Sequence, residues 1–141
     1  MAQSVDAYRA ALRVRTEDAH PVQWAMTQNN LGNALSNQGT RTAGEDGAAL
    51  LAKAVDAYRA ALRVRTEDAH PVQWARTQEN LALAHEAIAD HPTTTDPRPA
   101  LETALSHVEA ALTVFDPDHM SYNHVKATAL RDHLRARLAA L

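Results

Sequence analysis

Apolar side chains recur along the chain at the three- and four-residue spacing of amphipathic helices, and polar, glycine- or proline-containing stretches separate these runs. The pattern predicts six helices and no strands. The expected ranges are 4–16, 21–37, 46–66, 71–89, 97–115 and 118–141. Pro21 and Pro71 are well placed to open two of these helices, because proline suits the first helical position. The apolar stripe expected on the last helix consists of Tyr122, Val125, Ala129, Leu134 and Leu138.

Two stretches between the helices have the composition of loops. Residues 37–47 contain three glycines and are predicted to connect two helices, with Asp46 as the N-cap of the second. Residues 91–99 contain three prolines, and there Asp96 is the expected cap before Pro97 at the first helical position.

The pattern repeats with a period of 50 residues. The segment 5–25, VDAYRAALRVRTEDAHPVQWA, returns unchanged at 55–75, and a decayed third copy begins near 105. A fixed period in this range indicates a repeat array in which each unit packs on its neighbours. We therefore expect residues 1–141 to form a single repeat domain. A perfect duplication indicates recent amplification or engineering, and the sequence leaves both open.

The periodic residues resemble the tetratricopeptide repeat family. One helix carries a Leu-Gly pair followed by a larger residue, and the next carries Ala, an aromatic residue and Ala. The matching residues are Leu31, Gly32 and Leu35, then Ala54, Tyr58 and Ala61, and in the next unit Leu81, Ala82, Ala104, Val108 and Ala111. The family unit takes about 34 residues, so this chain resembles a long-unit, 50-residue variant like those of bacterial proteins in the class. The resemblance implies an all-α fold, a right-handed α-solenoid of antiparallel helical hairpins.

Composition narrows the possible functions. The formal net charge of −3 gives no basic field for nucleic acid, and no apolar run is long enough to cross a bilayer. The chain has no cysteine, and its first residues lack a signal-peptide pattern. We expect a soluble, cytoplasmic protein that binds neither nucleic acid nor membrane.

The resemblance also implies a binding groove. In tetratricopeptide arrays the first helix of each unit lines a concave groove, where asparagine amides grip a peptide backbone through paired donors and acceptors. The expected groove residues are Asn29, Asn30, Asn33, Arg76, Asn80 and Lys126. Arg76 and Lys126 would add charge for an acidic ligand, and the set partly matches the carboxylate clamp of chaperone-binding members. Glu79 places a negative charge there. The alternative is that these positions are simply solvated.

No residue pattern points to catalysis, a cofactor or a metal. Zinc-protease, phosphate-loop and nucleophile-elbow motifs are missing from the sequence, so we expect no enzyme. His20 and His70 are repeat equivalents in loops, and adjacent units are too far apart for both to bind one ion. Trp24 and Trp74 are expected to pack between helices rather than to stack on a ligand. The arginines in the repeated segment are expected to form a solvated face.

The leading function is a non-enzymatic scaffold that binds a protein or peptide in the groove. The alternative is a structural module that self-assembles through its end surfaces. For that alternative, Val5, Tyr8 and Leu12 on the first helix are the expected uncovered apolar flank, and a closed homodimer is the favoured assembly.

Overall fold

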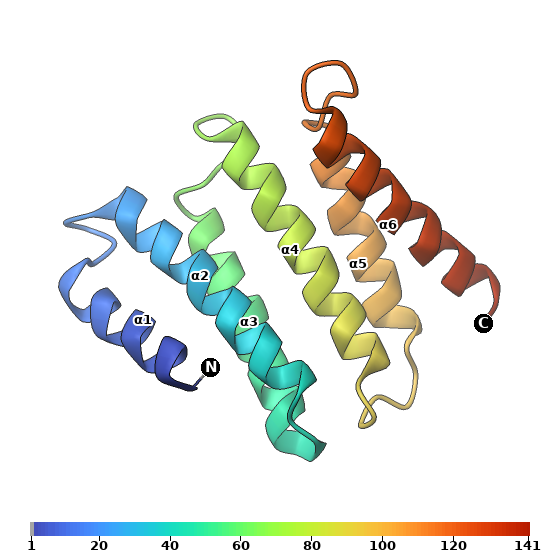
Figure 1. Ribbon diagram of the computed structural model, residues 1–141, viewed down its shortest axis with the longest axis horizontal. Helices are drawn as coiled ribbons and strands as arrows, with labels where there is room; N and C mark the ends of the chain where they lie inside the picture. The colour runs from blue at the N-terminus through green and yellow to red at the C-terminus, as the bar shows by residue number, and fades with distance from the viewer. Residues whose placement is uncertain (1) are drawn as a thin grey trace.

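The computed structural model describes residues 2–141, which form six α-helices and no strand (Figure 1). The predicted all-α fold is thereby confirmed for these residues. The helices are α1 (Ala2–Val14), α2 (Pro21–Thr40), α3 (Gly44–Leu62), α4 (Pro71–Asp90), α5 (Arg98–Leu112) and α6 (Ser121–Ala139).

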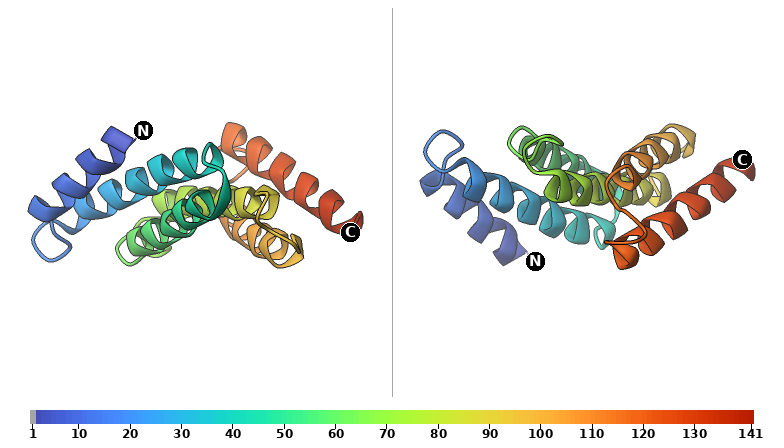
Figure 2. Two further views of the ribbon diagram at one scale, coloured as in Figure 1. Left: turned by 90° about the horizontal axis from the view of Figure 1, so that it is seen from below. Right: turned by 90° about the horizontal axis from the view of Figure 1, so that it is seen from above.

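The helices pack as consecutive hairpins. The most extensive packing joins α2 to α3 and α4 to α5, while α1 packs on α2 and α6 packs on α5. In Figure 1, α2, α4 and α6 lie nearer the viewer and α3 and α5 lie behind them, and Figure 2 shows this arrangement from below and from above. This packing of neighbours on neighbours is consistent with a helical repeat.

The identical segments adopt identical local structures. Pro21 and Pro71 open α2 and α4 as predicted, and the histidine before each proline has φ −141° and ψ 66° in both copies. In each copy a threonine hydroxyl accepts a hydrogen bond from the N–H three residues later, Thr16 from Ala19 at 3.3 Å and Thr66 from Ala69 at 3.2 Å. The same sequence therefore produces the same turn twice.

The predicted glycine-rich loop is wrong, because most of residues 37–47 are helical. The break between α2 and α3 covers only residues 41–43, and Gly44, the first residue of α3, has φ +71°. Gly39 and Gly47 instead allow close packing. A Cβ at position 39 would lie 2.8 Å from Cγ of Leu51, and one at position 47 would lie 1.9 Å from the carbonyl oxygen of Thr42. These glycines are required by close neighbours and not by chain flexibility.

Other predicted boundaries also shift. Asp46 is not an N-cap, because α3 already begins at Gly44 and Asp46 lies in its first turn. The predicted cap of the fifth helix is displaced by one residue, because α5 begins at Arg98 and Pro97 is its N-cap. The carboxylate of Asp96 still accepts a hydrogen bond from the N–H of Arg98 at 3.1 Å. The fifth helix ends at Leu112 rather than at residue 115, and the buried Phe115 lies in the turn that follows.

The core consists of small, closely packed contacts. One cluster joins α4, α5 and α6 around Leu101, Val108 and Phe115. A second cluster joins the four helices α1, α2, α3 and α4 around Leu35 and Leu81. Buried alanines fill much of the space between helices in both clusters. The chain therefore assembles its core with few aromatic rings.

The predicted stripe on the last helix is only partly correct. Leu134 is fully buried, but the side chains of Tyr122 and Val125 are 78% and 67% exposed, so they do not pack on α4 or α5. Ion pairs hold α6 in addition to its apolar contacts. They join Arg135 to Glu109, Arg137 to Asp90 and Glu86, and Lys126 to Glu79. Nε2 of His133 also lies 3.3 Å from the carboxylate of Glu86.

A buried histidine, His91, links the turn between α2 and α3 to the turn between α4 and α5. Nε2 of His91 lies 3.2 Å from the carbonyl oxygen of Thr42, and Nδ1 lies 2.9 Å from the hydroxyl of Thr93. Because a carbonyl oxygen only accepts, Nε2 donates and Nδ1 accepts. Only 6% of His91 is exposed, and its ring occupies the space left by the missing side chain of Gly47.

Candidate functional site

Four of the predicted groove residues line one polar pocket of about 420 Å³, which we call the basic pocket. It lies among α2, α4 and α6 and includes one residue that follows α3. Its lining residues are Asn29, Arg65, Gln73, Arg76, Glu79, Asn80, Asn123 and Lys126. Of the six predicted residues, the structure thus brings together Asn29, Arg76, Asn80 and Lys126.

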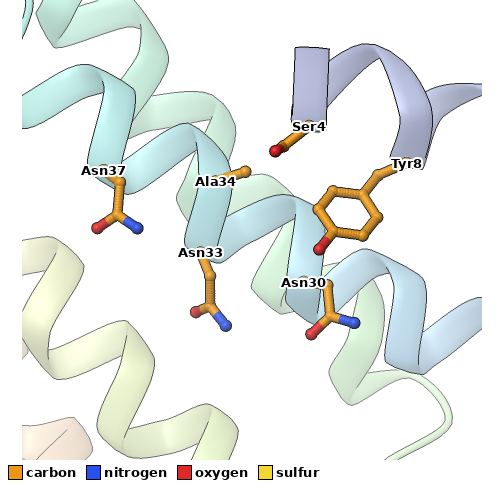
Figure 3. A pocket seen from close by; sticks show the side chains of 6 residues that line it. All are labelled: Ser4, Tyr8, Asn30, Asn33, Ala34 and Asn37. Carbon is orange, nitrogen blue, oxygen red and sulfur yellow. The ribbon is translucent and has the colours of Figure 1, made fainter. Parts of the chain in front are cut away.

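Asn30 and Asn33 lie outside the basic pocket and line the end pocket, a hollow of about 210 Å³ between α1 and α2. Figure 3 shows the amides of Asn30, Asn33 and Asn37 extending to one side of α2, with Tyr8 of α1 beside Asn30. Asn30 and Asn37 make no side-chain hydrogen bond to another described residue. Their donors and acceptors are therefore available to a ligand.

A central pocket of about 310 Å³ connects the two. It shares Asn33 and Asn37 with the end pocket and Asn80 with the basic pocket. We call the surface formed by the end, central and basic pockets the amide groove. An amide is present at each junction, so polar donors and acceptors continue from α1 across to α6.

Asn29 and Asn80 also have a structural role that the sequence did not reveal. The side-chain oxygen of Asn29 accepts hydrogen bonds from the hydroxyl of Thr77 and the amide of Asn80, each at 3.1 Å. Thr77 is fully buried, so these bonds connect α2 to α4 at the floor of the groove. The two asparagines stabilise the wall of the site, which reduces what they offer to a ligand.

Asn33 is fixed by a similar contact. Its side-chain oxygen accepts a hydrogen bond of 2.5 Å from the hydroxyl of Tyr58 on α3. Burial raises the pKa of Tyr58 above its ordinary value, so this phenol stays a donor. The amide nitrogen of Asn33 is left facing the groove with no partner among the described residues.

The charges of the basic pocket are unbalanced. Lys126 lies 3.4 Å from the carboxylate of Glu79, whose side chain is only 9% exposed. Arg65 and Arg76 have no ion pair or side-chain hydrogen bond within residues 2–141. Burial, followed by the positive charge of Arg76, lowers the pKa of Arg65 from its ordinary value. Three basic side chains face one acidic side chain, so two positive charges remain uncompensated.

Arg65 was missed in the sequence because its local environment is identical to that of Arg15, where a solvated face is the natural interpretation. The arginines of the second copy were expected to form one solvated face, but in the structure they have different surroundings. Arg63 binds Glu17 at 3.1 Å and lies over the ring of Trp24, while Arg65 enters the basic pocket. The two copies first differ at the equivalent positions Met26 and Arg76. This difference is the one sequence signal that could have distinguished Arg65 from Arg15.

The tryptophans have the expected packing role. Trp24 is 7% exposed and packs in a small cluster with α3, and the guanidinium of Arg63 lies 4.9 Å from its ring centroid. Trp74 is half-buried against the cluster that joins α4, α5 and α6.

Of the expected self-association flank, only Val5 is covered by the chain itself, so the prediction of an uncovered surface is wrong at that residue, while Tyr8 and Leu12 are partly exposed. Val5 is 4% exposed and belongs to the second core cluster, on which Tyr8 and Leu12 also pack. The reason is that α1 turns this side toward α2.

A stacked histidine pair lies between α4 and α5 and was also missed. The rings of His85 and His107 are 5.5 Å apart at an angle of 15°, and Nδ1 of His107 lies 2.6 Å from the side-chain oxygen of Gln78. Burial, the neighbouring His107 and Arg59 lower the pKa of His85 to about 4. Nε2 of His85 is buried without a hydrogen-bond partner. Sequence alone gives no contact between residues 22 positions apart on separate helices.

Residues 2–141 contain no group of three or more His, Asp or Glu side chains placed to hold a metal ion. Among the same residues, no helix is long and apolar enough to span a membrane. Comparison with known protein families, curated proteins and solved structures finds no match.

Proposed function

We propose that the protein is a non-enzymatic interaction module that binds an extended peptide segment along the amide groove. The main observation that supports this proposal is that the end, central and basic pockets are continuous and share asparagine side chains. An amide pairs with a peptide group whatever side chain follows, so a row of amides suits an extended backbone. In this proposal the helices form a right-handed solenoid, and the protein acts in the cytoplasm.

Preorganisation supports this function. Asn29 and Asn33 are held by hydrogen bonds from α4 and α3, so their orientation is fixed before a ligand arrives. Fewer side chains must then be ordered on binding, which reduces the entropic cost. Asn30 and Asn37 contribute amides with no competing partner within the described chain.

Self-assembly through α1 has less support. Val5 is buried within its own chain, so only parts of Tyr8 and Leu12 are available to a second copy. Tyr8 also lines the end pocket, where a peptide would compete with that contact. Peptide binding is therefore the function that the geometry supports better.

Selection from a random-peptide display library tests the proposal. Peptides that bind the wild-type chain should bind a double variant, Asn30→Ala with Asn37→Ala, about tenfold or more weakly, because each lost hydrogen bond costs about 1 kcal/mol. The matched control, Gln28→Ala with Gln38→Ala, removes two amides from α2 that do not line the groove. Failure to select any peptide that distinguishes the two double variants would contradict the proposal.

A further inference from the structure

A second pocket adjoins the basic pocket and has the opposite character. This aliphatic pocket, of about 180 Å³, lies between the start of α2 and the turn after α3. Its lining residues are Val22, Ala25, Met26, Val64, Arg65, His70 and Gln73. Arg65 and Gln73 line both pockets, so one ligand can reach both at once.

Two of the apolar side chains that line the aliphatic pocket are exposed to solvent. Val22 is 57% exposed and Met26 is 44% exposed, although both stand beside Val64 in a hollow. An aliphatic side chain of a ligand would remove this surface from water, which typically strengthens binding tenfold or more.

The basic pocket favours a negatively charged group on the ligand, next to the aliphatic side chain. Lys126 is already paired with Glu79, whereas Arg65 and Arg76 have no acidic partner within the described chain. A single carboxylate would compensate one of the two remaining charges, and a dianionic group would compensate both. Guanidinium groups present paired donors that match the oxygens of phosphate and carboxylate. The amides of Gln73 and Asn123 line the same pocket and supply further donors.

We propose that the basic and aliphatic pockets together recognise a peptide in which a dianionic group stands beside an aliphatic side chain. The dianion is either a phosphorylated side chain or a pair of adjacent carboxylates. This inference rests on the proposed function and names the class of peptide that the groove takes.

Nucleic acid is a less suitable ligand for the same charges. Its affinity grows with the number of phosphates that the protein neutralises. Here only two uncompensated cations meet in the pocket, and the whole chain has a net charge of −3. An isolated dianion fits this arrangement better than a polyanion does.

Fluorescence anisotropy with short labelled peptides, acetylated and amidated at their ends, tests the inference. Each peptide carries leucine next to phosphoserine, an Asp-Asp pair, a single Asp or serine, in both orders. We expect at least one dianionic peptide to bind about tenfold or more tightly than the single-Asp peptide. The phosphoserine and Asp-Asp peptides distinguish the two sources of the dianion. Replacing leucine by glycine should weaken binding by a comparable factor.

The internal repeat supplies a matched control. Arg65→Gln and Arg76→Gln should each remove most of the advantage of the dianionic peptide. Arg15→Gln should leave it unchanged, because Arg15 has the same local sequence and is exposed outside both pockets. Met26→Gln should weaken only the peptides that contain leucine.

Several outcomes would overturn the inference. These are equal affinity for dianionic and monoanionic peptides, an advantage that survives both Arg65→Gln and Arg76→Gln, and inorganic phosphate binding as tightly as the phosphopeptide. Tighter binding of a single-stranded oligonucleotide would also overturn it, in favour of nucleic acid. Library-selected peptides that still require Asn30 and Asn37 would then leave the proposed function standing, whereas the absence of any such peptide would remove the proposed function itself.

Discussion

The ring of Tyr58 lies against the backbone of Gly32, so closely that a Cβ at position 32 would be 2.6 Å from Cε1 of the ring. The hydroxyl of the same ring bonds to Asn33 in the groove. Fifty residues later the equivalent positions hold Ala82 and Val108, which belong to one core cluster. The two repeats therefore use complementary pairs of residues, glycine with a large ring and alanine with a smaller side chain.

Gly32→Ala should destabilise the protein by about 1–3 kcal/mol, because the added methyl overlaps the tyrosine ring. The double variant with Tyr58→Val copies the pair of the second repeat and should cost less than the sum of the two single changes. Urea unfolding of all four proteins measures this coupling. Additive effects would show that the close approach is not what limits position 32.

Asn29→Ala should lower the free energy of unfolding by about 1–3 kcal/mol, since it removes the acceptor of two hydrogen bonds and leaves the buried Thr77 hydroxyl unpaired. Asn30→Ala is the matched change on the same helix and should leave stability nearly unchanged. Thermal unfolding followed by circular dichroism makes the comparison, and equal midpoints for the two variants would argue against the bridge between α2 and α4.

Trp24→Ala should cost about 3–5 kcal/mol, because a nearly buried ring and its contact with Arg63 are lost. Trp74→Ala should cost less, since Trp74 is only half-buried. Chemical denaturation of both variants tests the order. A larger effect at Trp74 would mean that the cluster joining α4, α5 and α6 depends on this tryptophan more than its burial indicates.

Stability should fall as the pH drops from about 6.5 towards 4. The folded state holds the pKa of His85 at about 4, while the unfolded chain has an ordinary value near 6.5. The unfolded state therefore binds a proton first, and the contribution of His85 is complete above pH 6.5 and lost below it. We expect a loss of about 1–2 kcal/mol, allowing for partial solvent exposure of the ring.

His85→Gln should flatten this part of the pH profile, measured as the urea midpoint between pH 7 and pH 4. His20→Gln changes an exposed histidine at the start of α2 and should preserve the profile. Parallel profiles for wild type and His85→Gln would assign the acid sensitivity to other groups, among them His107, whose pKa is also lowered by burial.

Much of the fold was predictable because its signals are local. Pro21 and Pro71 mark helix starts through the geometry of a single residue, and the 50-residue period fixes which faces recur. The loop prediction failed at Gly39 and Gly47 because a glycine that permits contact has the same sequence signature as one that bends the chain. Only the neighbouring Leu51 and Thr42 distinguish the two cases.

The candidate site was predictable as a surface but not in its interactions. Asn30 and Asn33 were expected in the groove, and Figure 3 shows their amides on one side of α2. Asn37 extends to the same side but was missed, because it was assigned to the glycine-rich loop. The pairing of Asn29 with Asn80 depends on how α2 and α4 are aligned, and the repeat period does not determine that alignment. Arg65 was hidden for a related reason, since its copy Arg15 has the same sequence and a different neighbour.

The contact of His91 with Thr42 joins the turn between α2 and α3 to the turn after α4, so we expect the two turns to open together. Arrays of helical repeats ordinarily fray one unit at a time from an end, because each unit touches only its neighbours. Here the α2–α3 turn cannot separate without exposing an imidazole that also orders the turn after α4. Amide hydrogens in both turns should consequently exchange with solvent as one cooperative unit, with a common free energy of opening.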